Sequence, residues 1–272
     1  MNVMINGLPG NVAVMLTRHI VADERFELVP YSLTGPEITV SEHSVAGVTV
    51  NLVRPEDKES RLAEIKAAHA DFISVDFTHP TAVNENADFY CRHGFPFVMG
   101  TTGGDRQALI QTVENSNNLA VIAPNMAKQI VGFQAMLEFA AENFPGLFSG
   151  YTLAVRESHQ QGKADTSGTA KAVVKSFNDL GVDFATEQIK MERDPASQQK
   201  QWGIPPAYLG GHGWHTYTLL SPDETVRFEF THNINGREVY AYGTLDALVF
   251  LAGKIKEGVA GKVYSMVDVL KG

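Results

Sequence analysis

A histidine and a lysine lie four residues apart in one short stretch of this chain, at His159 and Lys163, and are followed by Ser167-Gly168-Thr169. Imidazole can exchange protons near neutral pH, and lysine is a cation unless it is desolvated. The next residues predict a helix with Ser167 as its N-cap and Gly181 at its end, because apolar residues recur at helical spacing, at Ala170, Val173, Val174 and Phe177. Free amides at a helix N-terminus bind anions. The stretch therefore predicts an acid–base site for a small anionic molecule.

Composition places the chain among ordinary globular enzymes. Its 272 residues are 44% hydrophobic and 19% charged, with a formal net charge of −9. Such a charge argues against nucleic acid as a partner, and no apolar run reaches the length needed to span a membrane. A lone cysteine, Cys91, fits a reducing compartment. The first expected strand begins almost at Met1, which leaves no room for a targeting segment, so we expect a cytoplasmic protein.

The first residues predict a strand, a glycine turn and a helix. Val3-Met4-Ile5 is apolar, the turn runs from Gly7 to Gly10, and the helix pattern begins near Val12. This is the context of a dinucleotide-binding loop, with the motif shortened to Gly-x-x-Gly-x-x-Ala. Taken alone, the loop fits phosphate binding and a plain turn about equally well.

Further strands alternate with helices, which predicts a parallel sheet. We expect strands at 26–31, 71–77, 97–99 and 119–123. Ligands of such sheets bind beyond the carboxyl ends of the strands. Four turns fall at such ends and predict a nucleotide site at one rim: Gly7 to Gly10, Asp76 to Thr78, Gly100 to Thr102, and Ala123 to Asn125.

The turn after the second strand bears on the choice of nicotinamide cofactor. Tyr31-Ser32-Leu33-Thr34-Gly35 contains no carboxylate to bind ribose hydroxyls and no arginine. Hydroxyls and amides such as those of Ser32 and Thr34 can bind a phosphate, so NADPH is modestly favoured while NADH stays possible. A polar turn without a ligand explains the same residues equally well.

The periodicity changes in the second half. After a long helix over 128–143, alternating residues predict strands at 151–155, 214–220 and 225–232, and Asn235-Gly236 predicts a tight turn before a strand at 238–242. A final helix follows. The fold class is therefore α/β, with a Rossmann-type parallel-sheet nucleotide domain (1–127 plus 241–272) and an inserted α+β domain (128–240) that carries a mixed or antiparallel sheet. Oligomerisation is one way to cover the edges of that sheet.

Together these motifs resemble the 4-hydroxy-tetrahydrodipicolinate reductase (dihydrodipicolinate reductase) family nearly end to end. The resemblance rests on the four rim turns and on Glu157-x-His159-x3-Lys163-x-Asp165-x-Ser167-Gly168-Thr169-Ala170. The run from Ala123 to Gln129 is similar to the plant-type branch. Members reduce a cyclic imine dicarboxylate with NAD(P)H at its C4, on the diaminopimelate route to lysine, and form homotetramers through the second domain.

The resemblance also implies roles for particular residues. It makes His159 and Lys163 the acid–base pair, with Lys163 as the proton donor, and it places the substrate carboxylates at Gly168 and Thr169, beside Ser167, and at Arg237. Gln160 stands where the family often has a second histidine; it can bond a carboxylate but adds no charge. The implied cofactor contacts are Gly7, Leu8, Pro9, Gly10, Asn11, Val12, Phe77, Gly100, Thr101, Thr102, Ala123, Pro124, Asn125 and Met126.

Other interpretations of single residues are weaker. His212-x-x-His215 suggests zinc, but no third ligand lies at a convincing spacing, so we expect no metal. Glu157 and Asp165 are expected to orient neighbours or cap helices, and Cys91 to pack. Two other functions stay open: a related dehydrogenase acting on another anionic imine or aldehyde, and a non-catalytic NADPH sensor, which would not need the His/Lys pair.

Overall fold

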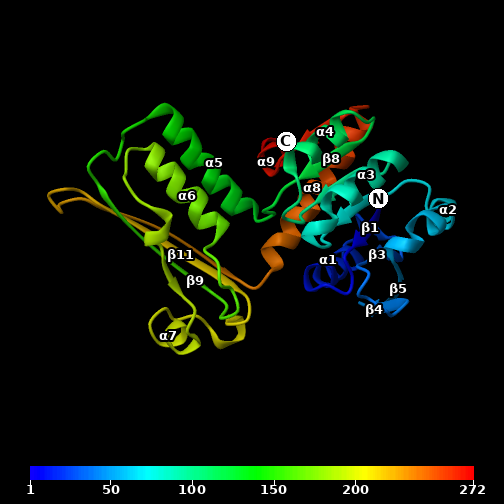
Figure 1. Cartoon of the computed structure of the whole chain (residues 1–272), viewed down its shortest axis with the longest axis horizontal. Helices are drawn as coiled ribbons and strands as arrows, with labels where there is room; N and C mark the ends of the chain where they lie inside the picture. Colours follow the sequence, from blue (N-terminus) through cyan, green and yellow to red (C-terminus); the bar gives the residue numbers. More distant parts are fainter. The chain divides into compact units, whose positions relative to one another are not determined.

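The computed structural model describes residues 1–272, and the chain divides into two compact units (Figure 1). Unit 1 contains Met1–Lys128 and Tyr240–Gly272, and unit 2 contains Gln129–Val239. These boundaries differ by one residue from the ranges expected from the sequence. The expected fold class, a Rossmann-type domain with an inserted α+β domain, is confirmed by the sheets described below.

Unit 1 contains a six-stranded sheet in which every neighbouring pair is parallel. The parallel arrangement follows from the alternation of strands and helices along the chain. In spatial order the strands are β13 (Lys262–Tyr264), β8 (Leu119–Ile122), β7 (Phe97–Met99), β6 (Ile73–Asp76), β1 (Asn2–Asn6) and β2 (Glu27–Leu28).

The expected second strand is broken at Pro30. Its first part is β2, and its second part, β3 (Tyr31–Leu33), belongs to a separate three-stranded sheet with β5 (Val48–Val53) and β4 (Glu42–Val45). Sequence reasoning missed this β4–β5 hairpin. The end of β3 nevertheless stays beside β1, because the Gly7 amide donates to the Leu33 carbonyl over 2.9 Å. The break thus leaves the turn after β3 next to the glycine loop.

Helices cover both faces of the parallel sheet. The ring of Tyr242 in α8 packs edge-on against His19 in α1, so these two helices share a face. On the other face, Lys58 at the start of α2 pairs with Glu85 of α3. The helices are α1 (Asn11–Ala22), α2 (Lys58–Ala68), α3 (Val83–His93), α4 (Arg106–Glu114), α8 (Glu238–Lys256) and α9 (Met266–Lys271), with 3-10 turns at Pro55–Asp57 and Pro80–Ala82.

A fully buried carboxylate, Asp76, joins the turns at the rim of this sheet. It accepts hydrogen bonds from the Tyr90 hydroxyl at 2.8 Å and the Thr101 hydroxyl at 2.5 Å. The Thr78 hydroxyl and the Asn86 amide also donate to it, at 2.8 and 3.0 Å. Hydroxyl and amide donors thus compensate a charge that has no ion-pair partner within bonding distance. The network fixes the turns after β6 and β7 relative to each other.

Unit 2 is built on a four-stranded sheet in which β9 and β10 are parallel and the other neighbours antiparallel. The spatial order is β10 (Lys190–Glu192), β9 (Thr152–His159), β11 (His212–Leu220) and β12 (Arg227–Asn235). The prediction of a strand at 238–242 is wrong. The Asn235-Gly236 turn leads instead into α8, whose buried residues, including Ala241 and Leu245, recur at helical spacing.

Two helices, α5 (Lys128–Asn143) and α6 (Gly168–Asp179), pack on one face of this sheet. Val173, Val174 and Phe177 of α6 are completely buried against inward residues of β9 and β11 such as Val155 and Tyr217. Gly181 has φ +101° just after the helix, as its predicted terminating position requires. The remaining helical segments are α7 (Pro195–Lys200), Thr186–Gln188 and Pro206–Tyr208. None of the helices is long and apolar enough to cross a bilayer.

Candidate active site

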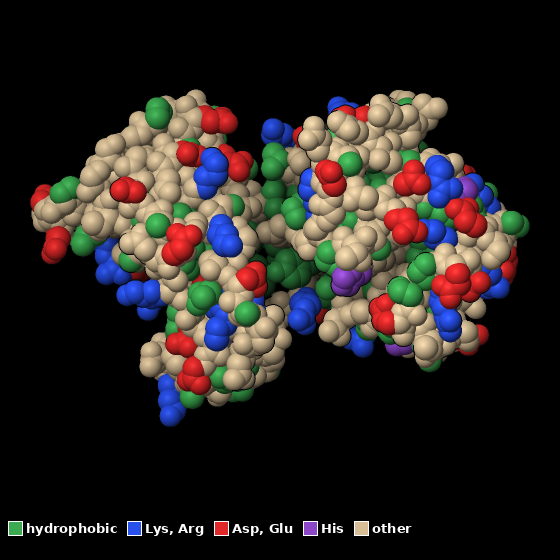
Figure 2. Space-filling view, viewed as in Figure 1, with side chains coloured by type: hydrophobic (Ala, Val, Ile, Leu, Met, Phe, Trp, Pro, Cys, Tyr) green, Lys and Arg blue, Asp and Glu red, His purple; other side chains and the backbone are tan.

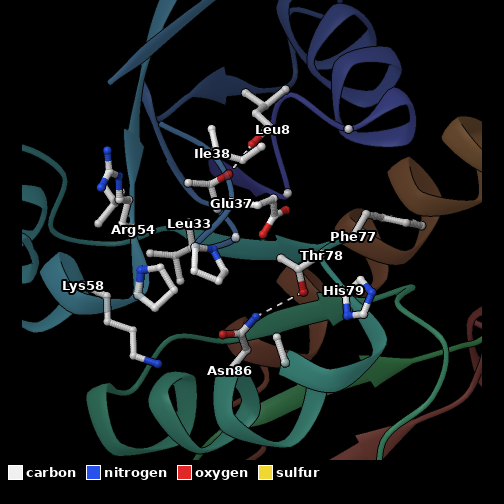
Figure 3. A pocket seen from close by; sticks show the side chains of 18 of the residues that line it. Leu8, Leu33, Glu37, Ile38, Arg54, Lys58, Phe77, Thr78, His79 and Asn86 are labelled. Carbon is white, nitrogen blue, oxygen red and sulfur yellow. Dashed lines mark hydrogen bonds between the residues drawn. The ribbon is translucent and has the colours of Figure 1, made fainter. Parts of the chain in front are cut away.

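A pocket of about 740 Å³ opens in unit 1 at the carboxyl ends of β1, β3, β5 and β6 (Figure 3). The Gly7–Gly10 loop, Thr34 and Phe77 line it, as expected for cofactor contacts. Glu37, Arg54 and Lys58 also line it, and sequence reasoning had not selected them. The rim prediction therefore located a real concavity, whose charged side chains come from later in the chain.

The glycine loop brings backbone close to backbone at this pocket. Gly7 has φ +108°, and a Cβ there would lie 2.1 Å from the Phe77 carbonyl oxygen. A Cβ on Gly100 would lie 2.2 Å from the Phe77 ring. Only glycine fits at position 7, whereas a side chain at position 100 would require the Phe77 ring to move. The α1 helix begins at Asn11 directly after this loop, so its free amides face the same rim and suit a pyrophosphate.

The other expected cofactor residues do not line this pocket. Ser32 is completely buried, and its hydroxyl accepts from the Leu8 amide, so it supports the loop from below. Thr34, which does line the pocket, donates to the Leu8 carbonyl at 2.7 Å and holds the same loop. The remaining residues lie at or next to the same ends of β1, β7 and β8, outside the pocket: Asn11, Val12, Gly100, Thr101, Thr102, Ala123, Pro124, Asn125 and Met126.

Unit 2 holds the His/Lys stretch. His159 ends β9, and Lys163 lies in the loop that leads to α6, where its ammonium pairs with Asp165 at 2.7 Å. The guanidinium of Arg193, which the sequence analysis did not select, fixes that loop. It donates to the Lys163 carbonyl at 2.8 Å and to the Asp165 carbonyl at 3.3 Å. The shape of the loop thus depends on a residue 30 positions away.

The same arginine binds the buried carboxylate of Glu157. The Arg193–Glu157 contact is 2.5 Å, and the Ser167 amide donates to the other Glu157 oxygen at 3.0 Å. Burial raises the pKa of Glu157, but hydrogen bonds from His215, Arg193 and Ser167 outweigh it and lower that pKa to about 2. Glu157 is therefore a fixed anion that ties the loop and the start of α6 to β9, consistent with the orienting role expected for it.

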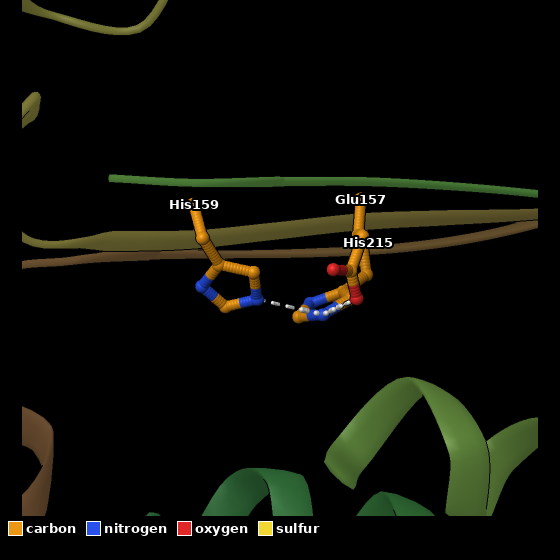
Figure 4. Close-up of side chains that lie close together, drawn as sticks. All are labelled: Glu157, His159 and His215. Carbon is orange, nitrogen blue, oxygen red and sulfur yellow. Dashed lines mark hydrogen bonds and ion pairs between the residues drawn. The ribbon is translucent and has the colours of Figure 1, made fainter. Parts of the chain in front are cut away.

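Strand register places a row of titratable groups on one face of the sheet. Glu157 of β9 is paired with His215 of β11, which is paired with His232 of β12. Figure 4 shows Glu157, His159 and His215 projecting from the same face, and one polar atom of each lies within 4.8 Å of the others. His215 Nε2 is 3.3 Å from His159 Nε2. His212 and His215 do not share a site, since His212 bonds Ser158 and the Tyr208 carbonyl.

His159 is neutral near pH 7 in this arrangement. Burial and the neighbouring His215 lower its pKa to about 4, although Glu157 opposes this. Its Nδ1 lies 3.0 Å from the His212 carbonyl, which only accepts, so Nδ1 carries the proton. His159 is thus a weak acid source at neutral pH.

The expected substrate residues lie around the start of α6 and one end of the sheet. Ser167 occupies the N-cap position without a side-chain cap bond, and the Gly168 and Thr169 amides have no protein acceptor. Gln160 is half-buried and begins the loop. Arg237 lies after β12 with its guanidinium next to Gly211, which precedes β11. Because Gly213 of β11 pairs with His159, Arg237 is at the same end of the sheet.

Sequence reasoning did not select Arg193 or Gln198, whose side-chain amide donates to the His159 carbonyl at 2.7 Å, and it considered His215 only as half of a zinc motif that lacks a third ligand. Alternation along β11 could have placed His215 on the buried face beside Tyr217. No local pattern marks Arg193 or Gln198, because each acts through a contact made by folding.

Buried neutral histidines predict that acid destabilises unit 2. Burial lowers the pKa of His232 to about 3, and neither of its ring nitrogens has a partner. The pKa of His232 is lower in the folded than in the unfolded protein. The contribution of the neutral ring to the free energy of unfolding is therefore complete above pH 6.5 and is lost as pH falls toward 3. Between pH 7.5 and pH 4.5, we expect the free energy of unfolding of His232→Phe to fall by about 2 kcal/mol less than that of the native protein, as measured by urea denaturation. An identical pH slope in the variant and the native protein would contradict this.

Charge on the surface is mixed in sign. Acidic and basic side chains are interspersed on the face shown in Figure 2. With a net charge of −9, this distribution offers no extended basic track for nucleic acid on that face.

Two family models match the chain: "Dihydrodipicolinate reductase, N-terminus" over residues 1–126 and "Dihydrodipicolinate reductase, C-terminus" over residues 130–270. The chain belongs to the dihydrodipicolinate reductase family. The expected family and an NAD(P)H-dependent reductase activity on the diaminopimelate route are thereby confirmed.

Individual relatives agree with this assignment. The chain is 47% identical to the probable 4-hydroxy-tetrahydrodipicolinate reductase 1 of Oryza sativa subsp. japonica and 45% identical to reductase 1 of Arabidopsis thaliana. Each match covers 99% of this chain and 78% of the relative. The dipicolinate-bound dihydrodipicolinate reductase from Paenisporosarcina sp. TG-14 shares the fold, with a TM-score of 0.67, 18% identity and 97% of both chains covered.

The comparison corrects the expected cytoplasmic location. Both plant relatives, together with the second reductase of each plant, are named as chloroplastic proteins. The inference from the position of the first strand therefore does not stand.

Proposed function

We propose that this chain reduces 4-hydroxy-tetrahydrodipicolinate to tetrahydrodipicolinate, with Lys163 as proton donor and NADPH as the preferred cofactor. The observation that carries the proposal is the Arg193–Glu157 network, which holds the Lys163 loop and the α6 amides as one assembly. The Lys163 ammonium, as cation and proton donor, and the amides at the N-terminus of α6 would then bind the same anionic molecule.

The residues of unit 2 suit a diacid that gains electrons. Loss of water from the 4-hydroxy substrate gives a conjugated cyclic imine, and a bound nicotinamide would supply the hydride. The unpaired amides of Gly168 and Thr169 bind one carboxylate, and Arg237 binds the other. Negative charge that develops in the ring is neutralised by the proton of Lys163. Gln160 hydrogen-bonds the substrate without adding charge.

Cofactor binding is assigned to the unit 1 rim. Gly7, Leu8, Pro9, Gly10, Asn11 and Val12 form a loop and helix start suited to a pyrophosphate, and no side chain would fit at Gly7. Gly100 to Thr102 and Ala123 to Met126 lie at the ends of the neighbouring strands. Their position along one edge of the sheet supports the proposal that a dinucleotide would contact them.

A direct assay tests the proposed reaction. Purified protein is mixed with freshly generated 4-hydroxy-tetrahydrodipicolinate and NADPH, and absorbance loss is followed. Substrate-dependent oxidation of NADPH supports the proposal. NADPH oxidation that occurs only with other cyclic imines or aldehydes would favour a related dehydrogenase. NADPH binding without turnover of any of them would favour a sensor.

Preference for NADPH rests on the charges of the unit 1 pocket. Arg54 lies at the end of β5, beside β3, and can pair with a 2′-phosphate, whereas Glu37 could instead accept from ribose hydroxyls. We expect Arg54→Met to lower kcat/KM for NADPH about 10- to 100-fold while changing that for NADH little. Arg61→Met, which removes a cation paired with Glu64 on α2, is the matched control. Equal losses for both cofactors would assign Arg54 to structure.

The sheet of unit 2 also supports a homotetramer. Its outward face carries exposed polar residues such as Arg156 and Glu229, and β12 is a nine-residue edge strand with no neighbour on its outer side. Such edges are commonly covered by another chain. Light scattering should give four times the chain mass of 29.7 kDa. The chain mass itself would contradict this part of the proposal.

A further inference from the structure

The contact between two imidazoles in unit 2 has no role in the reaction as described so far. His159 Nε2 and His215 Nε2 lie 3.3 Å apart, and their rings meet edge to face with centroids 5.0 Å apart. His215 is almost completely buried, and Gly213 of the same strand leaves room for the His159 ring. Two neutral imidazoles can bond at this distance only if one nitrogen carries hydrogen and the other does not.

The surrounding acceptors decide where those hydrogens are. His159 gives its Nδ1 proton to the His212 carbonyl, so its Nε2 has a free lone pair. His215 Nδ1 is buried and has no partner, so a proton there would be unsatisfied. His215 Nε2 faces two acceptors, His159 Nε2 at 3.3 Å and a Glu157 oxygen at 3.6 Å. The proton of His215 therefore belongs on Nε2.

We propose that His215, backed by Glu157, is a positioning residue whose Nε2–H donates a hydrogen bond to His159 Nε2 and so reinforces the Nδ1-protonated neutral tautomer that the His212 carbonyl also favours. The proposal rests on the proposed reductase function, because it explains how one member of the expected acid–base pair is kept neutral and oriented beside the Lys163 loop. His215 touches neither the substrate nor the cofactor in this account.

Charged and titratable groups around the pair are consistent with this role. Glu157 lies on β9, His212 on the first residue of β11, His232 on β12, and Arg193 after β10. Arg193 fixes the Glu157 carboxylate, so Glu157 can hold the His215 ring without taking its proton. From the helix layer, the Ser167 amide contacts Glu157 and Phe133 packs against His232. Orientation of one histidine by a second group that is itself hydrogen-bonded is a common way to fix a tautomer.

Two substitutions separate donation from packing. His215→Gln keeps an N–H donor able to reach His159 but cannot ionise, whereas His215→Phe keeps a ring of similar size and loses the donor. His232→Phe, in the same row but without a hydrogen bond to His159, is the matched control. Imidazole ¹⁵N chemical shifts report the His159 tautomer in the folded protein without any turnover.

We expect the native protein, His215→Gln and His232→Phe to show His159 protonated at Nδ1. His215→Phe should show a larger fraction of the Nε2-protonated tautomer, because only the His212 carbonyl then favours Nδ1 protonation. In the assay with NADPH, kcat should fall about 10- to 100-fold in His215→Phe and recover in His215→Gln, with an unchanged KM for NADPH.

An unchanged His159 tautomer in His215→Phe would overturn the inference, as would equal activity losses in the Gln and Phe variants. The tautomer measurement stands apart from catalysis. If the protein fails to reduce the proposed substrate but shows the tautomer pattern, the proposed function fails and the positioning role survives. If it turns over normally without that pattern, the reverse holds.

Discussion

Replacing Lys163 by methionine is expected to lower kcat about 10²- to 10⁴-fold while leaving NADPH affinity unchanged. Lys163 supplies the proton in our proposal because His159 is neutral near pH 7, its pKa lowered to about 4 by burial and by His215. Methionine keeps much of the length of the side chain and removes its charge and its donors. Single-turnover absorbance measures the chemical step, and quenching of protein fluorescence by NADPH measures cofactor binding.

Lys171→Met provides the comparison for this experiment, since Lys171 is an exposed cation on α6, eight residues further along the chain. It should leave kcat within about twofold of the native value. A Lys163→Met enzyme with native kcat would remove Lys163 from the chemistry. A parallel loss of NADPH affinity would instead assign Lys163 to cofactor binding.

Replacing Arg193 by methionine should cost about 3–5 kcal/mol in the free energy of unfolding, because it leaves the buried Glu157 carboxylate without its cation. Glu157 is completely buried, and the Arg193 side chain is 17% exposed. The loop should also loosen, because Arg193 bonds the carbonyls of Lys163 and Asp165. Urea denaturation at pH 7.5 measures the loss, and a fall in kcat measures the effect on the loop.

A second substitution identifies the cause of that loss. Glu157→Gln combined with Arg193→Met removes the buried charge together with its partner and should recover part of the stability. Arg227→Met removes an exposed ion pair with Glu229, whose side chains are 64% and 45% exposed, and should cost less than about 1 kcal/mol. If Arg193→Met lost no more free energy of unfolding than Arg227→Met, the Arg193–Glu157 pair would not contribute to stability.

Local patterns predicted much of the scaffold. The helix predicted over 128–143 is α5, and the N-cap at Ser167 and the terminating Gly181 lie where the spacing placed them. Alternation of strand and helix predicted the parallel sheet and its ligand-binding rim. These features depend on residues within a few turns of one another, so neighbouring side chains are sufficient to specify them. The strand predicted over 238–242 failed because helical packing of α8 against unit 1 outweighs local strand preference.

The sequence by itself determined that His159, Lys163 and the α6 amides share one short segment, because a few residues of chain cannot separate them. Only the tertiary structure decided what surrounds them. Pairing of β9 with β11 brings His215, 56 residues away, to His159, and the turn after β10 brings Arg193 to Glu157. A shift of one residue in that pairing would turn His215 to the other face of the sheet, and no local pattern fixes such a register. The local sequence therefore determines which reactive groups lie next to His159 along the chain. Its protonation state depends on strands that meet only on folding.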